Sequence, residues 1–138
     1  MALLIHAYED GNVRPWEHLP AKAGTYKVGQ ALVMDATNGY LTPVASGTGE
    51  DTDEGKHYVS MADRVLAANG DILPVVASDD QMVWEIPLQA ANSSIKVGAA
   101  YTLHTDGMHL TNTTTKGCFT VLGFNGTAAG DLVRGKLA

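Results

Sequence analysis

Hydrophobic and polar residues alternate over short stretches of this chain, and turn-forming residues separate the stretches. In the segment 81–88, Met82, Trp84 and Ile86 fall on one face of an extended backbone. Threonine and valine are plentiful, and β-branched residues favour pleated surfaces. The pattern predicts roughly nine to eleven strands. The segments are 26–36, 41–45, 57–66, 72–78, 81–88, 95–105, 108–115, 117–124 and 132–137.

Glycine punctuates these stretches. The chain has 15 glycines in 138 residues, at intervals of roughly ten residues. Asn38-Gly39 and Asp106-Gly107 each stand between two apolar runs. Both dipeptides accept the positive φ angles of tight hairpin turns, so each predicts a hairpin.

The segment 57–66 is ambiguous. Tyr58, Met61 and Val65 have helical spacing, although the start of the segment reads equally well as a strand. The glycine-rich flanks favour the strand. We therefore predict an all-β fold: a compact antiparallel barrel or sandwich with short hairpins and an extended N-terminal arm.

One internal similarity links two of the predicted hairpins. Lys-Val-Gly occurs at residue 27 and again at residue 96, and at the same offset Leu41-Thr42 recurs as Leu110-Thr111. The segments 27–42 and 96–111 are thus either a duplicated hairpin unit or a convergent pattern. Duplication would give two related halves that close one barrel.

The N-terminal segment differs from the rest of the chain. Pro15, Pro20 and Gly11 resist regular structure, yet the segment carries large apolar side chains that favour burial. We divide the chain into an extended arm over 1–22 and a single β domain over 23–138. The arm either packs on its own domain or docks on a partner or a neighbouring subunit.

Composition excludes several classes of protein. The length predicts one domain, and 9 basic against 15 acidic side chains give a net charge of −6, which disfavours binding to nucleic acid. A single cysteine excludes an internal disulfide framework. No apolar run approaches the ~18 residues of a membrane helix, and the N-terminus lacks the basic region of a secretory signal.

No residue pattern predicts catalysis or metal binding. His104 and His109 flank the Asp106-Gly107 turn, but hairpin histidines are usually plain surface residues. The acidic cluster within 47–56 lacks the spacing of a calcium loop, and Cys118 has the apolar neighbours of a buried, inert thiol. We expect no enzyme, no catalytic residue, no metal and no cofactor.

From residue 22 onward the sequence resembles the small capsid decoration, or cement, proteins of tailed bacteriophages and prophages. The segment 24–32 reads G-x-Y-x-x-G-x-x-L, and a strand ending at Asp35, the Asn38-Gly39 turn and Pro43-Val44 follow it. HYVSMADRV, ILPVVAS and the C-terminal GTAAGDLVRGKLA fit the same scheme. Lambda-type decoration proteins share the plan of an N-terminal arm before a small β domain, although they are shorter.

The resemblance implies a structural protein of the virion. Such proteins are made in the bacterial host cytoplasm, bind the exterior of the mature capsid and stabilise it by bridging major capsid subunits. The implied partner is the major capsid protein, with a homotrimer as one implied assembly, and neither nucleic acid nor a membrane is an expected partner. The expected capsid-binding residues are Leu3, Leu4, Ile5, Tyr8 and Trp16. The alternative is a carbohydrate- or receptor-binding β module of a phage head or tail, with Trp84 or Tyr101 at the ligand.

Overall fold

The computed structural model describes residues 2–44 and 55–138, and no helix occurs in either range. The predicted all-β fold is confirmed. The strands are β1 (Leu4–Tyr8), β2 (Glu17–Ala21), β3 (Gly24–Tyr26), β4 (Ala31–Met34), β5 (Leu41–Pro43), β6 (His57–Ser60), β7 (Arg64–Leu66), β8 (Asp71–Ala77), β9 (Met82–Pro87), β10 (Ala100–Tyr101), β11 (Phe119–Phe124) and β12 (Leu132–Leu137). No helix of the described ranges could therefore cross a membrane.

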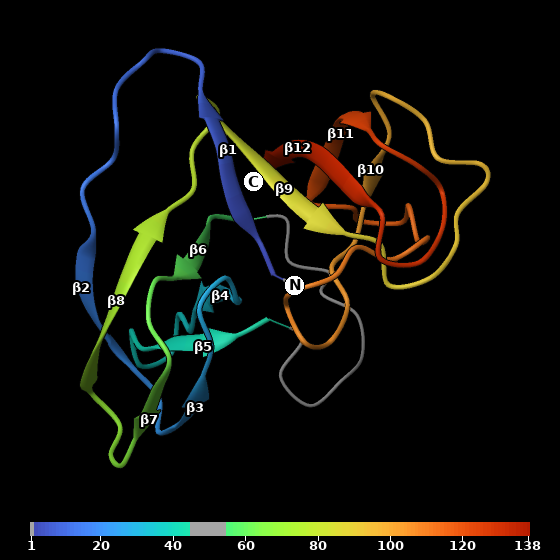
Figure 1. The fold of residues 1–138 in the computed structure, drawn as a ribbon. Coiled ribbons are helices and arrows are strands. Elements are labelled where there is room, and N and C mark those ends of the chain that lie inside the picture. The colour runs from blue at the N-terminus through green and yellow to red at the C-terminus, as the bar shows by residue number, and fades with distance from the viewer. Residues whose placement is uncertain (1, 45–54) are drawn as a thin grey trace.

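Five strands of the first half form a closed barrel in the order β2-β5-β4-β6-β8 (Figure 1). All its pairings are antiparallel except β2 with β5, which meet in parallel through the single pair Ala21↔Leu41. β3 and β7 form a separate two-stranded ribbon. The barrel encloses a small apolar cluster of Ala21, Tyr26, Leu32, Leu41, Leu66, Leu73 and Val75.

Four strands of the second half and the N-terminal β1 form a five-stranded sheet in the order β1-β9-β12-β11-β10. Its core contains the fully buried Trp84 and Phe119, and the predicted apolar face of β9 lies in it. The indole Nε1 of Trp84 donates a hydrogen bond to Ser78 Oγ at 3.0 Å. The same core includes four residues of the barrel, so the two halves share one apolar interior: Ala31, Val44, Val59 and Val76.

The strand pairings of the second half repeat those of the barrel. β9 lies against β12 as β2 lies against β8, and Pro87 opposite Leu132 corresponds to Pro20 opposite Ile72. Two isolated bridges, Leu103↔Leu110 and the parallel Leu88↔Leu110, complete a second ring. In the barrel, Leu103↔Leu110 corresponds to Met34↔Leu41, and Leu88↔Leu110 corresponds to the parallel Ala21↔Leu41.

Two further pairs of the barrel also have counterparts in the second half. Leu32↔Tyr58 corresponds to Tyr101↔Phe119, and Tyr58↔Ala77 corresponds to Phe119↔Leu137.

The two Lys-Val-Gly motifs form the same turn. The Gln30 amide donates to the Lys27 carbonyl at 3.1 Å, and the Ala99 amide donates to the Lys96 carbonyl at 3.3 Å. Segments 27–42 and 96–111 thus occupy equivalent places in the two halves. A common origin by duplication stays a prediction from the sequence, and the repeated pairings agree with it.

Residues 2–22 are extended, and they pack on their own chain. β1 pairs antiparallel with β9, and β2 is a strand of the barrel. The sequence left open whether the arm packs on its own domain or docks on a partner, and in the structure it packs on its own domain. Pro20 is tolerated in β2 because its backbone nitrogen faces away from β8, so the pairing with β8 needs no amide hydrogen at this position.

Four predicted strand segments differ from the structure in detail. Segment 26–36 divides into the end of β3 and β4, and only Ala100–Tyr101 of segment 95–105 forms a strand, β10. The segment 57–66 is extended, as predicted, but it divides into β6 and β7. The segment 108–115 forms no strand and contributes only the bridges of Leu110, because hydrogen bonds of the hairpin hold it in an irregular path. The acidic cluster within 47–56 falls largely on residues 45–54, which lie outside the described residues.

Candidate functional site

The structure separates the five residues that the sequence assigned to capsid binding. Leu3 is 1% exposed and belongs to the core, whereas Leu4 is 49% exposed and Trp16 is 56% exposed. Ile5 and Tyr8 are half-buried against the core. Leu3 is held further by its amide, which donates to the Gly29 carbonyl at 3.0 Å. The accessible members of the set are therefore Leu4 on β1 and Trp16 at the start of β2.

Trp16 ends a long loop, residues 9–16, that connects β1 to β2 along the outside of the molecule (Figure 1). Val13 on this loop is 78% exposed. We call residues 9–16 the Trp16 loop. It presents two large apolar side chains to solvent.

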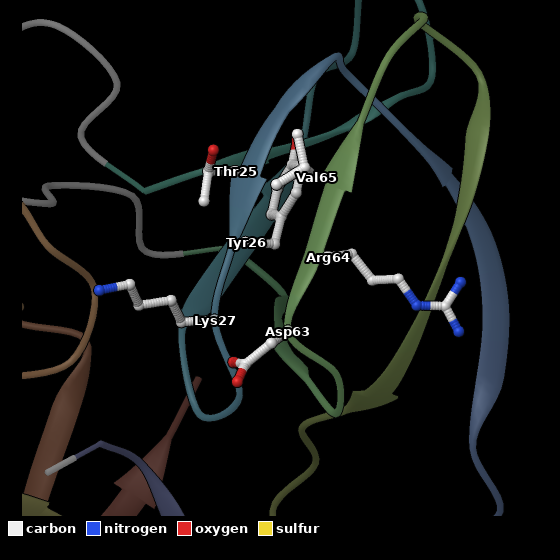
Figure 2. A pocket seen from close by; sticks show the side chains of 6 residues that line it. All are labelled: Thr25, Tyr26, Lys27, Asp63, Arg64 and Val65. Atoms are coloured by element: carbon white, nitrogen blue, oxygen red, sulfur yellow. The ribbon is translucent and has the colours of Figure 1, made fainter.

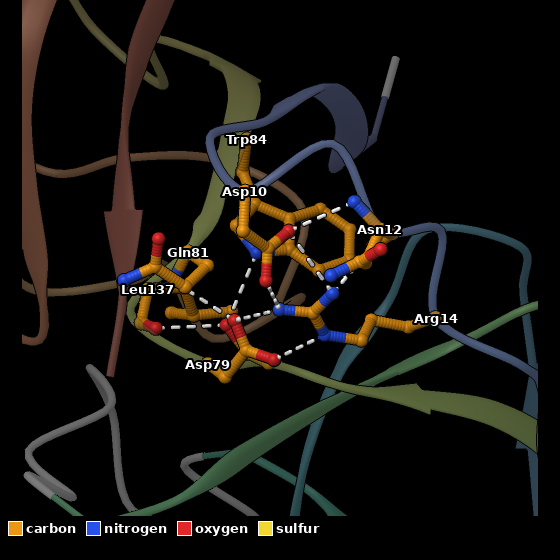
Figure 3. A network of polar contacts seen from close by, with 8 residues as sticks. Asp10, Asn12, Arg14, Asp79, Gln81, Trp84 and Leu137 are labelled. Atoms are coloured by element: carbon orange, nitrogen blue, oxygen red, sulfur yellow. Dashed lines mark hydrogen bonds and ion pairs between the residues drawn. The ribbon is translucent and has the colours of Figure 1, made fainter.

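Arg14 anchors the Trp16 loop to the connection between β8 and β9 (Figure 3). Its Nε lies 2.6 Å from Asp79 Oδ2, and its Nη2 lies 2.8 Å from Asp10 Oδ2. Nη1 also donates to the Asn12 carbonyl, and the guanidinium stands 5.7 Å from the centre of the Tyr8 ring. One side chain thus fixes both ends of the loop.

The ion pairs of Arg14 persist over a wide pH range. The hydrogen bond from Arg14, followed by the amide of Asn12, lowers the pKa of Asp10. The hydrogen bond from Arg14 likewise lowers the pKa of Asp79, and the two carboxylates in turn raise the pKa of Arg14. All three groups therefore carry their charges at neutral pH, and the loop that holds Val13 and Trp16 is braced.

A hollow of about 440 Å³ lies beside the β3–β7 ribbon (Figure 2). Its polar groups are engaged in holding the fold, since Asp63 Oδ1 accepts from the Val28 amide at 2.8 Å and the Tyr26 hydroxyl donates to the Lys22 carbonyl at 2.6 Å. Burial raises the pKa of Tyr26. Lys27 and Arg64 point away from each other in Figure 2. The hollow brings together no nucleophile and base.

His104 and His109 approach each other across the hairpin whose turn they flank. Their ring centroids lie 6.4 Å apart at an interplanar angle of 88°. Asp106 lies between them, with Oδ2 2.6 Å from His109 Nδ1 and Oδ1 3.5 Å from His104 Nδ1. Across residues 2–44 and 55–138, no group of three or more histidine, cysteine or acidic side chains could hold a metal ion.

This hairpin also joins the two halves of the molecule. The Ala31 amide, at the start of β4, donates to the Gly107 carbonyl at 2.9 Å. Burial would raise the pKa of Asp106, but the hydrogen bonds from the Met108 amide and His109 outweigh it, so the pKa of Asp106 is lowered. The charged carboxylate thus supports a turn that serves the fold.

The aromatic residues considered for a carbohydrate site lie in the interior. Trp84 is 0% exposed and Tyr101 is 4% exposed, so neither can stack on a sugar. Cys118 is buried, as its neighbours in the sequence predicted. The observations leave the Trp16 loop as the candidate site, and the exposure of Val13 and the role of Arg14 could not be found from the sequence.

Comparison with protein-family models finds no match for this chain, and no curated protein matches its sequence.

Proposed function

We propose that this protein is a structural protein of a phage virion. It binds the exterior of the mature capsid and stabilises it by bridging neighbouring major capsid subunits. The resemblance of residues 22–138 to capsid decoration proteins suggests this role, and the rigid all-β fold is compatible with it. The protein acts by surface fit and performs no chemistry.

The observation that carries the proposal is the exposed Trp16 on its braced loop. Tryptophan is enriched among the residues that dominate binding energy, because it buries a large apolar area in a partner's pocket. A loop that is already ordered loses little conformational entropy on binding. Trp16 and Val13 are therefore well placed to anchor a docking surface for a partner.

The remaining predicted contacts have unequal roles under this proposal. Leu4 lies exposed on β1 and can extend the contact, while Leu3 supports β1 from the core. A homotrimer, if formed, would present three Trp16 loops to the capsid and gain avidity from their number.

Co-sedimentation with expanded shells of the parent phage's major capsid protein tests the proposal. Replacing Trp16 with alanine is expected to weaken binding about 30-fold or more, since a hot-spot truncation costs about 2 kcal/mol or more. Val65→Ala is the matched control, because Val65 on β7 is also exposed, at 78%, but lies away from the loop. Wild-type protein that fails to sediment with the shells would contradict the proposal.

A further inference from the structure

β2 has an open edge. Along its whole length it pairs with β8 on one side, from Glu17↔Val75 to Ala21↔Asp71. On its other side the single pair Ala21↔Leu41 closes the barrel. Within the described residues, no strand lies against residues 16–19 on that side, and β2 forms the rim of the molecule in Figure 1.

The backbone groups at this edge belong to Trp16 and His18. The Ala21 carbonyl accepts from the Gly70 amide on the β8 side, whereas the Lys22 amide donates to the Leu41 carbonyl on the other side. Successive residues of an antiparallel strand turn their amide and carbonyl groups to alternate sides. The even-numbered residues of β2 therefore face outward. If the same alternation continues to Trp16, the residue before the strand, Trp16 and His18 together offer two donors and two acceptors.

The second half of the molecule shows what such an edge binds. Trp16 and His18 correspond to Val83 and Glu85 of β9, because β9 lies against β12 in the register in which β2 lies against β8. In β9 this edge is occupied: β1 pairs with it antiparallel, from Leu4↔Glu85 to Tyr8↔Met82. An extended segment with apolar side chains thus fills the place that is open on β2.

We propose that Trp16, which immediately precedes β2, and residues 17–18 of β2 accept an extended strand of the major capsid protein, antiparallel to β2 and in the place equivalent to that of β1 on β9. This inference rests on the proposed function and specifies how the partner is held. Main-chain hydrogen bonds to Trp16 and His18 supply the pairing, and the Trp16 side chain supplies the anchor. The contact is a strand addition at a rigid edge.

The occupant is a different chain and not a second copy of this one. If two copies paired about His18, each Trp16 would stand opposite Pro20 of the other copy, and Pro20 has no amide to donate. If they paired about Glu17, the two Glu17 carboxylates would stand directly opposite each other, and like charges in that position destabilise the pairing. β1 also has an outer edge, but a bulge between Ile5 and Ala7 interrupts it, as in strand edges that resist pairing. The register of β2 on β8 has no bulge, and Trp16 and His18 are neither proline nor lysine, although Pro15 and Pro20 limit the open edge to this short stretch.

Residue-resolved hydrogen exchange on the full-length protein tests the assignment. In the protein alone, the amides of Trp16 and His18 are expected to exchange rapidly, while those of Val83 and Glu85 are protected by β1. Binding to the expanded shells is expected to slow exchange at Trp16 and His18 at least 10-fold. A peptide elsewhere on the surface, such as the β3–β7 ribbon, serves as the internal control.

A substitution at the edge gives a second measurement. His18→Pro removes one outward amide and is expected to weaken shell binding at least 10-fold, whereas His18→Ala keeps the amide and is expected to bind within 2-fold of wild type. Should the proline variant misfold, the exchange measurement on the wild-type protein decides alone.

The outcomes separate the two proposals. Shell binding without protection at Trp16 and His18 would overturn the strand addition and leave the proposed function standing. Failure of the wild-type protein to bind shells would overturn both. Protection that rises with protein concentration in the absence of shells would show a second copy at the edge and overturn the choice of occupant.

Discussion

At the scale of single residues, neighbours in the chain have opposite environments. Leu3 is buried in the core that joins the two halves, and Leu4 next to it is half exposed. The difference follows from the alternation of side chains along an extended segment. Sequence reasoning grouped both as contacts for a partner because both are apolar, and only the register of β1 on β9 distinguishes them.

Gly29 and Gly98 occupy the same position of equivalent turns, with φ values of 80° and 88°. A β-carbon at Gly98 would meet open space, whereas one at Gly29 would lie 2.8 Å from the Leu3 carbonyl oxygen. Gly98→Ala is therefore expected to cost about 1–2 kcal/mol of unfolding free energy through backbone strain alone. Gly29→Ala is expected to cost at least about 1 kcal/mol more, from the added clash. Urea denaturation of both variants measures the difference, and equal costs would contradict the packing of Leu3 on Gly29.

Asp106 gives the hairpin a dependence on pH. Because its pKa is lowered in the folded state, the carboxylate contributes stability above its unfolded pKa of about 3.9, and that contribution is lost as pH falls through the folded pKa. Asp106→Asn is expected to lower the unfolding free energy by about 1 kcal/mol at pH 7. The difference from wild type should shrink as pH falls below the unfolded pKa and disappear once pH is below the folded pKa. Thermal unfolding across this range tests it, and a gap that persists at low pH would contradict the assignment.

The residue-scale features differ in how far the sequence reveals them. The face of Met82, Trp84 and Ile86 and the turn at Asp106-Gly107 are local patterns, and both are found in the structure. The contact of Arg14 with Asp79 joins residues 65 positions apart. Nothing local to Arg14 indicates that partner, so the bracing of the Trp16 loop could not be predicted.

At the scale of elements, the strands with alternating side chains were predictable and the two N-terminal strands were not. The prolines and glycines of residues 1–22 read as irregular chain, yet β1 and β2 form there. A proline disrupts strand pairing only where a backbone amide at its position would donate a hydrogen bond to the neighbouring strand. Whether Pro20 does so depends on which side of β2 pairs with β8 and which side is open. That information lies in the topology.

Removing β1 is expected to destabilise the whole molecule. Deletion of residues 2–8 uncovers the edge of β9 and takes Leu3 out of the core, and the loss of a buried leucine alone costs about 2–5 kcal/mol. The variant is expected to unfold at lower urea concentration and to aggregate through β9. Analytical ultracentrifugation and urea denaturation check both effects. A monomeric variant with the wild-type midpoint would show that β1 contributes little to the fold.

At the scale of the whole molecule, the two halves repeat one plan but share one interior. Val59 and Val76 of the barrel lie in the same cluster as Trp84 and Phe119 of the sheet. The Gly107 carbonyl and the Ala31 amide add a polar contact between the halves. The halves are therefore expected to fold together, despite their equivalence.

This shared interior predicts a single unfolding transition. Val59→Ala, a change in the barrel, is expected to cost on the order of 2 kcal/mol. In a Trp16→Phe background, where Trp84 is the remaining tryptophan, it is expected to lower the midpoint reported by the fluorescence of Trp84 in the other half. Far-ultraviolet circular dichroism should give the same midpoint. Two separate transitions, or a Trp84 signal that Val59→Ala does not move, would contradict the shared core.

The repeat itself was only partly visible in the sequence. The Lys-Val-Gly motifs retain their residues because a glycine with positive φ is needed in both turns. The turns at Asp71 and Asp131 also match, since both read Ala-x-Gly-Asp and each carboxylate accepts an amide three residues earlier. This motif recurs at a shorter offset than Lys-Val-Gly, so one ungapped alignment of the two halves does not reveal it. Strand pairs keep their register while their side chains change, so they leave no signal in the sequence.

The pairing of β1 with β9 has a consequence for protein synthesis. Leu4 leaves the ribosome 81 positions before Glu85, the residue opposite it. At about 5–20 residues per second, translation leaves the N-terminal strand without its partner for on the order of 4–16 s. The apolar segment Leu4–Tyr8 therefore stays unpaired during this interval, which makes it a natural place for a chaperone to act and a place where slow translation favours aggregation.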